Sequence, residues 1–304
     1  MGREGRDELR LVFSGRGCLL FRSPDGAGPS QFDIGIYCGL PFSPSLPIPV
    51  SQNPPPELVC QFTGFVAVCV LMKPKIKLAE SKIASGGTMA LYSHDGSFSM
   101  SIDGQELMHS EACASERLMG TLGVEKIELD VRPRILIGGL GLGFTLRSVV
   151  DAVGPEADID VAELVPEVIE WNRTYLKDLN GELLDREGID VFVEDVSEVI
   201  RKAKADFDTI IVDVDNGPVA MVAASNVSLY SNTGLKRVWG ALKKGGRAVF
   251  WSAKQDQAFE QRLKRAGFKV QAIPAKVHAR AKRAAYMLYV ADRSLGLGHQ
   301  DEQL

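Results

Sequence analysis

The sequence predicts an α/β fold: a mostly parallel seven-stranded sheet preceded by a small antiparallel β-unit. Three observations lead to this prediction. From Arg134 onward, short apolar runs alternate with amphipathic helical runs, which is typical of a parallel sheet covered by helices. A glycine-rich turn follows the first apolar run. Upstream, the pairs Asp95-Gly96 and Asp103-Gly104 are hairpin-turn signals between alternating strands.

Composition excludes several classes of protein. The 304 residues carry a net charge of −4, with 45% hydrophobic and 24% charged residues, which is ordinary for a soluble globular protein. The sequence has no excess of basic residues that would indicate a nucleic-acid partner. The longest apolar stretch, Leu58–Met72, is shorter than the ~18–20 residues of a membrane span, so we expect no membrane partner. With no evident targeting segment and one cysteine after Met72, we expect a cytoplasmic protein.

Three segments differ in character. Residues 1–71 contain no lysine but most of the prolines, and they are expected to be an irregular extension, disordered or read from a start codon set too early. A small disulfide-bonded module is the alternative, since Cys18, Cys38, Cys60 and Cys69 all lie there. Residues 72–124 are expected to form the β-unit and a helix, and residues 125–304 a Rossmann-like nucleoside-binding domain.

The elements follow in order. The β-unit should contain two or three strands over Thr88–Met108, and a helix should cover Ala112–Gly123. The seven sheet strands are expected at 135–139, 158–164, 189–195, 207–215, 247–253, 268–274 and 284–292. The helices between them are expected at 145–153, 165–180, 196–204, 232–246 and 257–268. The last two strands have no helix between them, which predicts an antiparallel hairpin at one edge of the sheet.

The glycine turn is the first candidate ligand site. In "RILIGGLGLGFTLRSVV", Gly139, Gly141 and Gly143 alternate between a strand and a helix. Missing side chains allow a ligand to approach the backbone closely, and N–H groups at a helix start point toward it. Close packing alone is the alternative. Dinucleotide-binding and adenosylmethionine-binding folds both have such a turn.

Acidic residues at the ends of the next two strands narrow the choice of ligand for the glycine turn. Glu163 ends the second strand, where a carboxylate can accept hydrogen bonds from both ribose hydroxyls, or can simply be solvated. Asp195, in "VEDV" at the end of the third strand, can accept from an adenine amino group. It can also cap the helix that follows, and one residue can do both.

The fourth strand ends in "IIVDVDNGP", which contains Asp213, Asp215 and Asn216. Carboxyl ends of parallel strands are where open α/β sheets bind ligands. We expect Asp213 to take part in chemistry, whereas Asp215 and Asn216 either contact substrate or only build the turn. The absence of a GxxxxGK[ST] motif argues against a P-loop nucleotide triphosphatase.

Together these features predict a class I adenosylmethionine-type, Rossmann-like fold. From about Leu91 to Asp292 the sequence resembles the spermidine synthases, or polyamine aminopropyltransferases, and in particular their bacterial spermidine-synthase-like branch. The similar segments are "SIDGQELM", "ILIGGLGLGFTLR", "VAELVPEVIEW", "VFVEDVSEVI", "FDTIIVDVDNGP" and "LKKGGRAVFWSA".

The resemblance implies an aminopropyl transfer from decarboxylated S-adenosylmethionine to a small-molecule polyamine amine, without a metal. It implies that the glycine turn holds the donor, Glu163 its ribose and Asp195 its adenine, and that Asp213 deprotonates the attacking amine. Glu116 matches the last position of the family's Tyr-His-Glu element. Tyr230 can line the acceptor pocket or simply pack. The family also suggests a homodimer.

Two alternative functions are suggested by positions where this sequence departs from the family pattern. The turn "GGLGLG" lacks the acid that the family places there, and Ala114 and Ser115 stand where the family has Tyr and His. One alternative is methyl transfer from S-adenosylmethionine, because "DNGP" distantly resembles the acid/Asn-Pro turn of amino-group methyltransferases. The other is a non-catalytic family member that binds a nucleoside.

Overall fold

The structure is a computed structural model that describes residues 9–14, 18–21, 57–63, 66–83, 86–127, 132–180, 182–214 and 228–295. The chain divides into two compact units. One comprises residues 1–76 with 93–96, and the other residues 77–92 with 97–304. None of the described helices is both long and apolar enough to cross a membrane.

In the first unit, four strands form an antiparallel sheet in the order β2-β1-β3-β4. They are β1 (Leu9–Ser14), β2 (Cys18–Phe21), β3 (Glu57–Thr63) and β4 (Val66–Met72). Strands therefore form within the stretch that was expected to be irregular, because these runs are apolar and free of proline. The proline-rich segment between them lies outside the described residues. The separation of residues 1–71 from the working domain stays a prediction.

The small β-unit is a second four-stranded sheet, in the order β5-β6-β7-β8. Its strands are β5 (Ile76–Lys82), β6 (Thr88–His94), β7 (Ser97–Ile102) and β8 (Gln105–His109). The turns from β6 to β7 and from β7 to β8 are the two Asp-Gly pairs, whose residues all have positive φ, between 47° and 82°. This is the backbone of the tight turns that hairpins favour. The sequence pattern predicted this unit but did not include β5.

The seven-stranded sheet has the order β11-β10-β9-β12-β13-β15-β14. The first five strands in this order, β11, β10, β9, β12 and β13, run parallel, whereas β15 pairs antiparallel with both β13 and β14. The predicted fold class is thereby confirmed, including the closing hairpin. The bounds are β9 (Arg134–Gly138), β10 (Asp158–Glu163), β11 (Ile189–Val193), β12 (Phe207–Val212), β13 (Leu242–Ser252), β14 (Phe268–Ala275) and β15 (Tyr286–Arg293).

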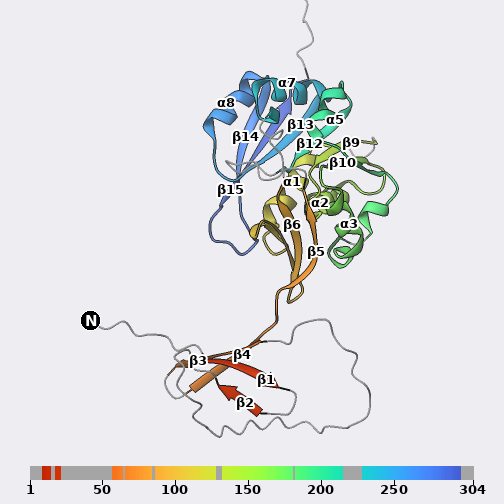
Figure 1. Cartoon of the computed structure of the whole chain (residues 1–304). Coiled ribbons are helices and arrows are strands. Elements are labelled where there is room, and N and C mark those ends of the chain that lie inside the picture. Colours follow the sequence, from red (N-terminus) through yellow and green to blue (C-terminus); the bar gives the residue numbers. More distant parts are fainter. Residues whose placement is uncertain are drawn as a thin grey trace, which may run out of the picture. The chain divides into compact units, whose positions relative to one another are not determined.

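Helices cover both faces of this sheet. Figure 1 shows α5 (Val196–Lys202), α7 (Asn232–Ala241) and α8 (Gln257–Arg265) together on one side. On the other side lie α1 (Ala114–Val124), α2 (Phe144–Val153) and α3 (Pro166–Thr174), followed in the chain by the short helices α4 (Lys177–Asn180) and η1 (Leu183–Asp185). Two separate hydrophobic clusters result, and the one containing α1 to α3 also includes buried residues of β6 and β7.

Two predicted helix ranges are wrong. The helix expected over 165–180 is interrupted between α3 and α4. The pattern indicated a helix over 232–246 closed by two glycines, but α7 ends at Ala241 and β13 begins at Leu242. Leu242 pairs with Phe207 of β12, and the register then shifts before Arg247 pairs with Thr209. Gly245, at φ 80°, lies within this irregularity. Pairing with β12 therefore overrides the helical pattern of the "LKK" segment.

Candidate functional site

A cavity of about 660 Å³, including open solvent at its mouth, lies at the carboxyl ends of β9 to β12. This is where open α/β sheets bind ligands. One wall is apolar and comes from β6, β7 and β8, and the other carries four carboxylates. The apolar wall is Met89, Met100, Leu107 and Met108, and the acids are Glu163, Glu194, Asp195 and Asp213. Gly139 and Gly141 also line the cavity, so the structure brings the predicted strand-end acids and two of the glycines together.

The glycines of the turn are required for different physical reasons. Gly139 has φ 90°, and a Cβ there would overlap the backbone carbonyl oxygen of Asp213. Gly143 has φ 81° at the N-cap of α2, and its Cβ would lie 2.5 Å from Nδ2 of Asn180. Both positions therefore exclude side chains because of packing. Gly141, at φ 52°, is different, because a Cβ there would meet only the flexible side chain of Met108, 3.2 Å from its sulfur.

Glu163 connects the glycine turn to the loop before α3. Its Oε2 accepts a hydrogen bond from the backbone N–H of Leu140, and its Oε1 accepts one from Val165, each at 2.9 Å. Burial raises the pKa of this carboxyl, and the backbone donors oppose the rise. The backbone N–H groups of Gly141 and Leu164 act on the carboxyl in the same way as those of Leu140 and Val165. The side chain therefore has a structural role in the turn while it also faces the cavity.

Asp195 is the N-cap of α5, and its Oδ1 accepts from the backbone N–H of Ser197 at 2.8 Å. It lines the cavity as well. The capping role is therefore observed, and the contact with adenine stays a prediction. Its neighbour Glu194 also lines the cavity and forms an ion pair with Lys202.

Asp213 and Glu116 form a pair of interacting carboxyls. Asp213 directly follows β12, and its Oδ2 accepts from the hydroxyl of Thr145 at 2.6 Å. Burial, together with the charge of Glu116, raises the pKa of Asp213 to about 7. Burial also raises the pKa of Glu116, whose Oε2 accepts from Ser115 at 2.6 Å. Burial and the charge of Glu116 raise the pKa of Tyr286 too, so this phenol belongs to the same neighbourhood.

Glu116 sits in the first turn of α1, and this helix packs closely on its neighbours. A Cβ at Gly120 would lie 2.8 Å from the carbonyl oxygen of Thr145, and one at Gly123 would lie 2.6 Å from the Ile211 side chain. Because these two glycines have no side chains, the backbone of α1 packs directly against α2 and β12. The approach brings the α1 end that carries Glu116 next to the end of β12.

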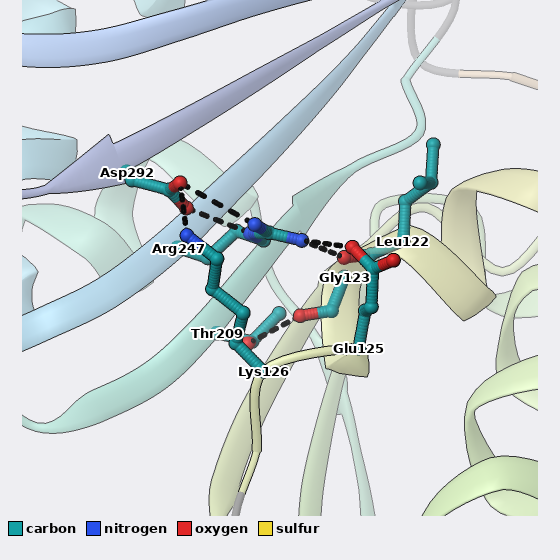
Figure 2. Close-up of polar contacts among 7 residues, drawn as sticks. All are labelled: Leu122, Gly123, Glu125, Lys126, Thr209, Arg247 and Asp292. Atoms are coloured by element: carbon teal, nitrogen blue, oxygen red, sulfur yellow. Dashed lines mark hydrogen bonds and ion pairs between the residues drawn. The ribbon is translucent and has the colours of Figure 1, made fainter.

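The other end of α1 is fixed by Arg247 of β13 (Figure 2). Its guanidinium, 5% exposed, binds Asp292 through Nε–Oδ1 at 2.7 Å and Nη2–Oδ2 at 3.3 Å. Nη1 donates to the carbonyl of Leu122 at 2.7 Å and to Glu125 at 3.1 Å. Lys126 adds a 2.6 Å ion pair to Asp292. Arginine here satisfies a carbonyl at the helix C-terminus that has no intrahelical partner.

Thr209 of β12 completes this junction. Its hydroxyl donates to the carbonyl of Gly123 at 2.8 Å, as Figure 2 shows. Thus two strands, β12 and β13, each hold one of the last carbonyls of α1. The helix is fixed at its C-terminal end while its N-terminal turn faces the site.

Sequence reasoning missed two asparagines that hold the glycine turn. Asn172 donates to the carbonyl of Gly141 at 2.8 Å, and Asn180 donates to that of Leu142 at 2.6 Å. Asn180 also donates to Oδ1 of Asn172 at 2.7 Å. The only signal in the sequence was a polar residue on the apolar face of the helix that became α3. The glycine turn is therefore held from two sides. Glu163 accepts a hydrogen bond from a backbone N–H of the turn, and the two asparagines donate to backbone carbonyls of the turn.

Three other residues were predicted for the site: Tyr230, Asp215 and Asn216. The ring of Tyr230 packs on Phe250 and Phe259, with centroids 5.9 and 5.2 Å away, and the residue does not line the described cavity. The ring contacts correspond to the packing alternative. Asp215 and Asn216 lie outside the described residues. Among the residues that the structure describes, no group of three His, Cys, Asp or Glu is placed to hold a metal.

The fold and cavity define an α/β protein with a cavity at the carboxyl ends of its parallel strands. A family profile described as "Spermine/spermidine synthase domain" matches residues 112–273. The chain belongs to the spermine/spermidine synthase family, as the sequence resemblance predicted.

Solved structures support the same fold. A spermidine synthase in complex with the transition-state analogue AdoDATO is similar, with a TM-score of 0.59 and 19% identity over 75% of this chain and 78% of that one. For the spermidine synthase from Thermotoga maritima the TM-score is 0.58, with 18% identity over 76% of each chain. A probable spermidine synthase from Corynebacterium glutamicum ATCC 13032 has a TM-score of 0.53, with 16% identity over 75% of this chain and 83% of that one. A search of curated proteins found no match.

Proposed function

We propose that this protein transfers an aminopropyl group from decarboxylated S-adenosylmethionine to a small-molecule amine, with Asp213 as the base. The observation that carries the proposal is the carboxyl pair of Asp213 and Glu116 beside the glycine turn. In the reaction, the amine nitrogen forms a bond to the carbon next to the sulfonium. The carbon–sulfur bond breaks, sulfur keeps the electron pair as a neutral thioether, and the proton of the amine passes to Asp213.

The raised pKa of Asp213 suits this role. An alkyl amine is mostly protonated near neutral pH, with a pKa of about 10, and only its neutral form attacks carbon. A base is most effective when its pKa lies near the working pH, and that of Asp213 is about 7. Glu116 supplies a second negative charge that attracts a cationic acceptor.

The adenosyl half of the donor would lie against the glycine turn. Glu163 lines the cavity beside the glycine turn, where its carboxylate would accept a hydrogen bond from a ribose hydroxyl. Asp195 has Oδ2 available for the adenine amino group while Oδ1 caps α5. The apolar wall opposite would cover the nucleoside and exclude water.

The surroundings of the donor's aminopropyl end give a reason to test two donors. At Gly141 the cavity has no acid, and Met108 is the neighbouring side chain. A free aminopropyl ammonium would therefore meet a thioether at that point. This observation keeps methyl transfer from S-adenosylmethionine as the alternative, and it also keeps open a nucleoside-binding protein without turnover.

Calorimetry with decarboxylated S-adenosylmethionine and with S-adenosylmethionine separates these functions, together with mass spectrometry of products formed from a panel of diamines. We expect tighter binding of the decarboxylated donor and an amine product heavier by one aminopropyl group. Binding of S-adenosylmethionine alone would overturn aminopropyl transfer. If neither donor binds, both enzymatic functions fail.

Asp213→Asn tests the base. We expect this variant to lose turnover by about 10²-fold or more while its donor affinity stays unchanged. Asp151→Asn, the same change at an exposed position of α2, is the matched control and should behave like wild type. Unchanged turnover in Asp213→Asn would reject the role.

A further inference from the structure

Thr145 is a buried hydroxyl that lies where three elements of the site meet. It is the second residue of α2 and is 2% exposed. Its Oγ1 donates to Oδ2 of Asp213, which follows β12, at 2.6 Å. The same oxygen lies 3.4 Å from the backbone carbonyl of Glu116 on α1. A threonine hydroxyl has one proton, and the shorter distance assigns it to Asp213.

We propose that Thr145 is a positioning residue for Asp213: its hydrogen bond fixes Oδ2, so that Oδ1 is the oxygen that receives the proton of the amine. The catalytic consequence rests on the proposed function, whereas the effect on the carboxyl itself does not. A carboxylate with two equivalent oxygens can rotate. One strong donor at a fixed place removes that freedom and selects one oxygen for substrate.

The buried position of Thr145 makes the hydrogen bond geometrically fixed. The close approach of α1, which Gly120 permits, places the backbone of Thr145 against that helix. The carbonyl of Gly138 accepts a hydrogen bond from the backbone N–H of Asp213 at 2.8 Å, so the acid is also held from β9. Donor and acceptor therefore belong to elements that are packed together.

The charges around Asp213 set the sign of the expected effect. Glu116 faces it from α1, and Tyr286 of β15 belongs to the same neighbourhood. The remaining titratable groups that line the cavity are Glu163 on β10, then Glu194 and Asp195 after β11. All of these groups are acids. The hydroxyl of Thr145 stabilises the ionised form of Asp213, so its removal raises the pKa of that carboxyl.

The direct test is a ¹³C NMR titration of the aspartate carboxyl carbons in the full-length protein without ligand, with the Asp213 signal assigned by its loss in Asp213→Asn. We expect Thr145→Val to raise the pKa of Asp213 by about 1. Thr145→Ser keeps the hydroxyl and should leave the pKa as in wild type. An unchanged pKa in Thr145→Val would overturn the proposal. Should Thr145→Val fail to fold, Thr145→Ala compared with Thr145→Ser isolates the hydroxyl in the same way.

Turnover gives the second readout. Below pH 7, Thr145→Val should lower kcat about tenfold, and the acidic limb of its pH profile should move upward by about 1, with donor affinity unchanged. A merely structural role would lower activity at every pH without moving the limb. If wild type has no transferase activity but the NMR shift appears, the proposed function fails and the positioning role stands. If wild type is active and neither readout moves, the positioning role fails.

Discussion

Replacing Asp213 by asparagine should change how stability depends on pH. The pKa of Asp213 is about 7 in the folded protein, against 3.8 ordinarily. Between those values the folded state binds the proton more tightly than the unfolded state. Stability from this group is therefore present at low pH and is lost as pH rises toward about 7. The difference in pKa corresponds to at most about 4 kcal/mol above pH 7.

Asparagine has nearly the same shape and no charge to desolvate. Its amide oxygen can keep the hydrogen bond from Thr145. The variant should therefore be about as stable as wild type near pH 4, and more stable than wild type near pH 8, by up to about 4 kcal/mol. The gain includes relief of Glu116, whose own ionisation becomes easier when its neighbour is neutral.

Urea unfolding at about pH 4, 6 and 8 measures this difference, followed by circular dichroism and fitted with a common slope. Asp151→Asn, the same change at an exposed position of α2, is the matched control. Parallel pH profiles for wild type and Asp213→Asn would refute the reasoning. They would mean that Asp213 ionises in the folded protein as it does in the unfolded chain.

Two further substitutions test how the site is held. Gly139→Ala should destabilise the protein by about 2 kcal/mol or more, because its φ of 90° is strained for alanine and the new Cβ would overlap the backbone of Asp213. Gly240→Ala is the control, because a Cβ at Gly240 meets nothing within 4 Å. Its stability should be unchanged or higher by up to about 1 kcal/mol. Equal urea midpoints for the two alanine variants would contradict the packing role. Arg247→Met should lower stability by about 2–3 kcal/mol, because it removes the hydrogen bond to the Leu122 carbonyl and leaves the partly buried Asp292 with only Lys126. A loss below about 1 kcal/mol would show that the junction does not hold α1.

The sheet and the glycine turn could be predicted because their signals are local. Short apolar runs that alternate with amphipathic helical runs identify parallel strands, and the alternating glycines mark the turn after the first of them. The strand-end acids then follow from the rule that the carboxyl ends of parallel strands meet at one edge of the sheet. No knowledge of distant contacts was needed for any of these steps.

What could not be predicted depends on contacts between distant parts of the chain. Arg247 binds the carbonyl of Leu122, 125 positions earlier, and Asn180 binds that of Leu142, 38 positions earlier. A lone arginine in a strand, or an asparagine near a helix end, has no periodic signature. The start of β13 was missed for the same reason, because pairing with β12 decides it.

The acids that line the cavity, together with Glu116 beside Asp213, divide into two kinds by what their oxygens already bind. Both oxygens of Glu163 accept backbone N–H groups, and Asp195 caps a helix, so these side chains also hold the cavity in shape. Asp213 and Glu116 each accept one side-chain hydroxyl and face one another as like charges. That repulsion falls when a cationic amine arrives, because the ammonium favours the ionised form of both acids. Once the ammonium gives up a proton and becomes the neutral nucleophile, the repulsion returns and drives one acid to keep that proton. An acid pair of this kind is therefore suited to deprotonate the amine for attack, whereas an isolated, well-solvated aspartate is not.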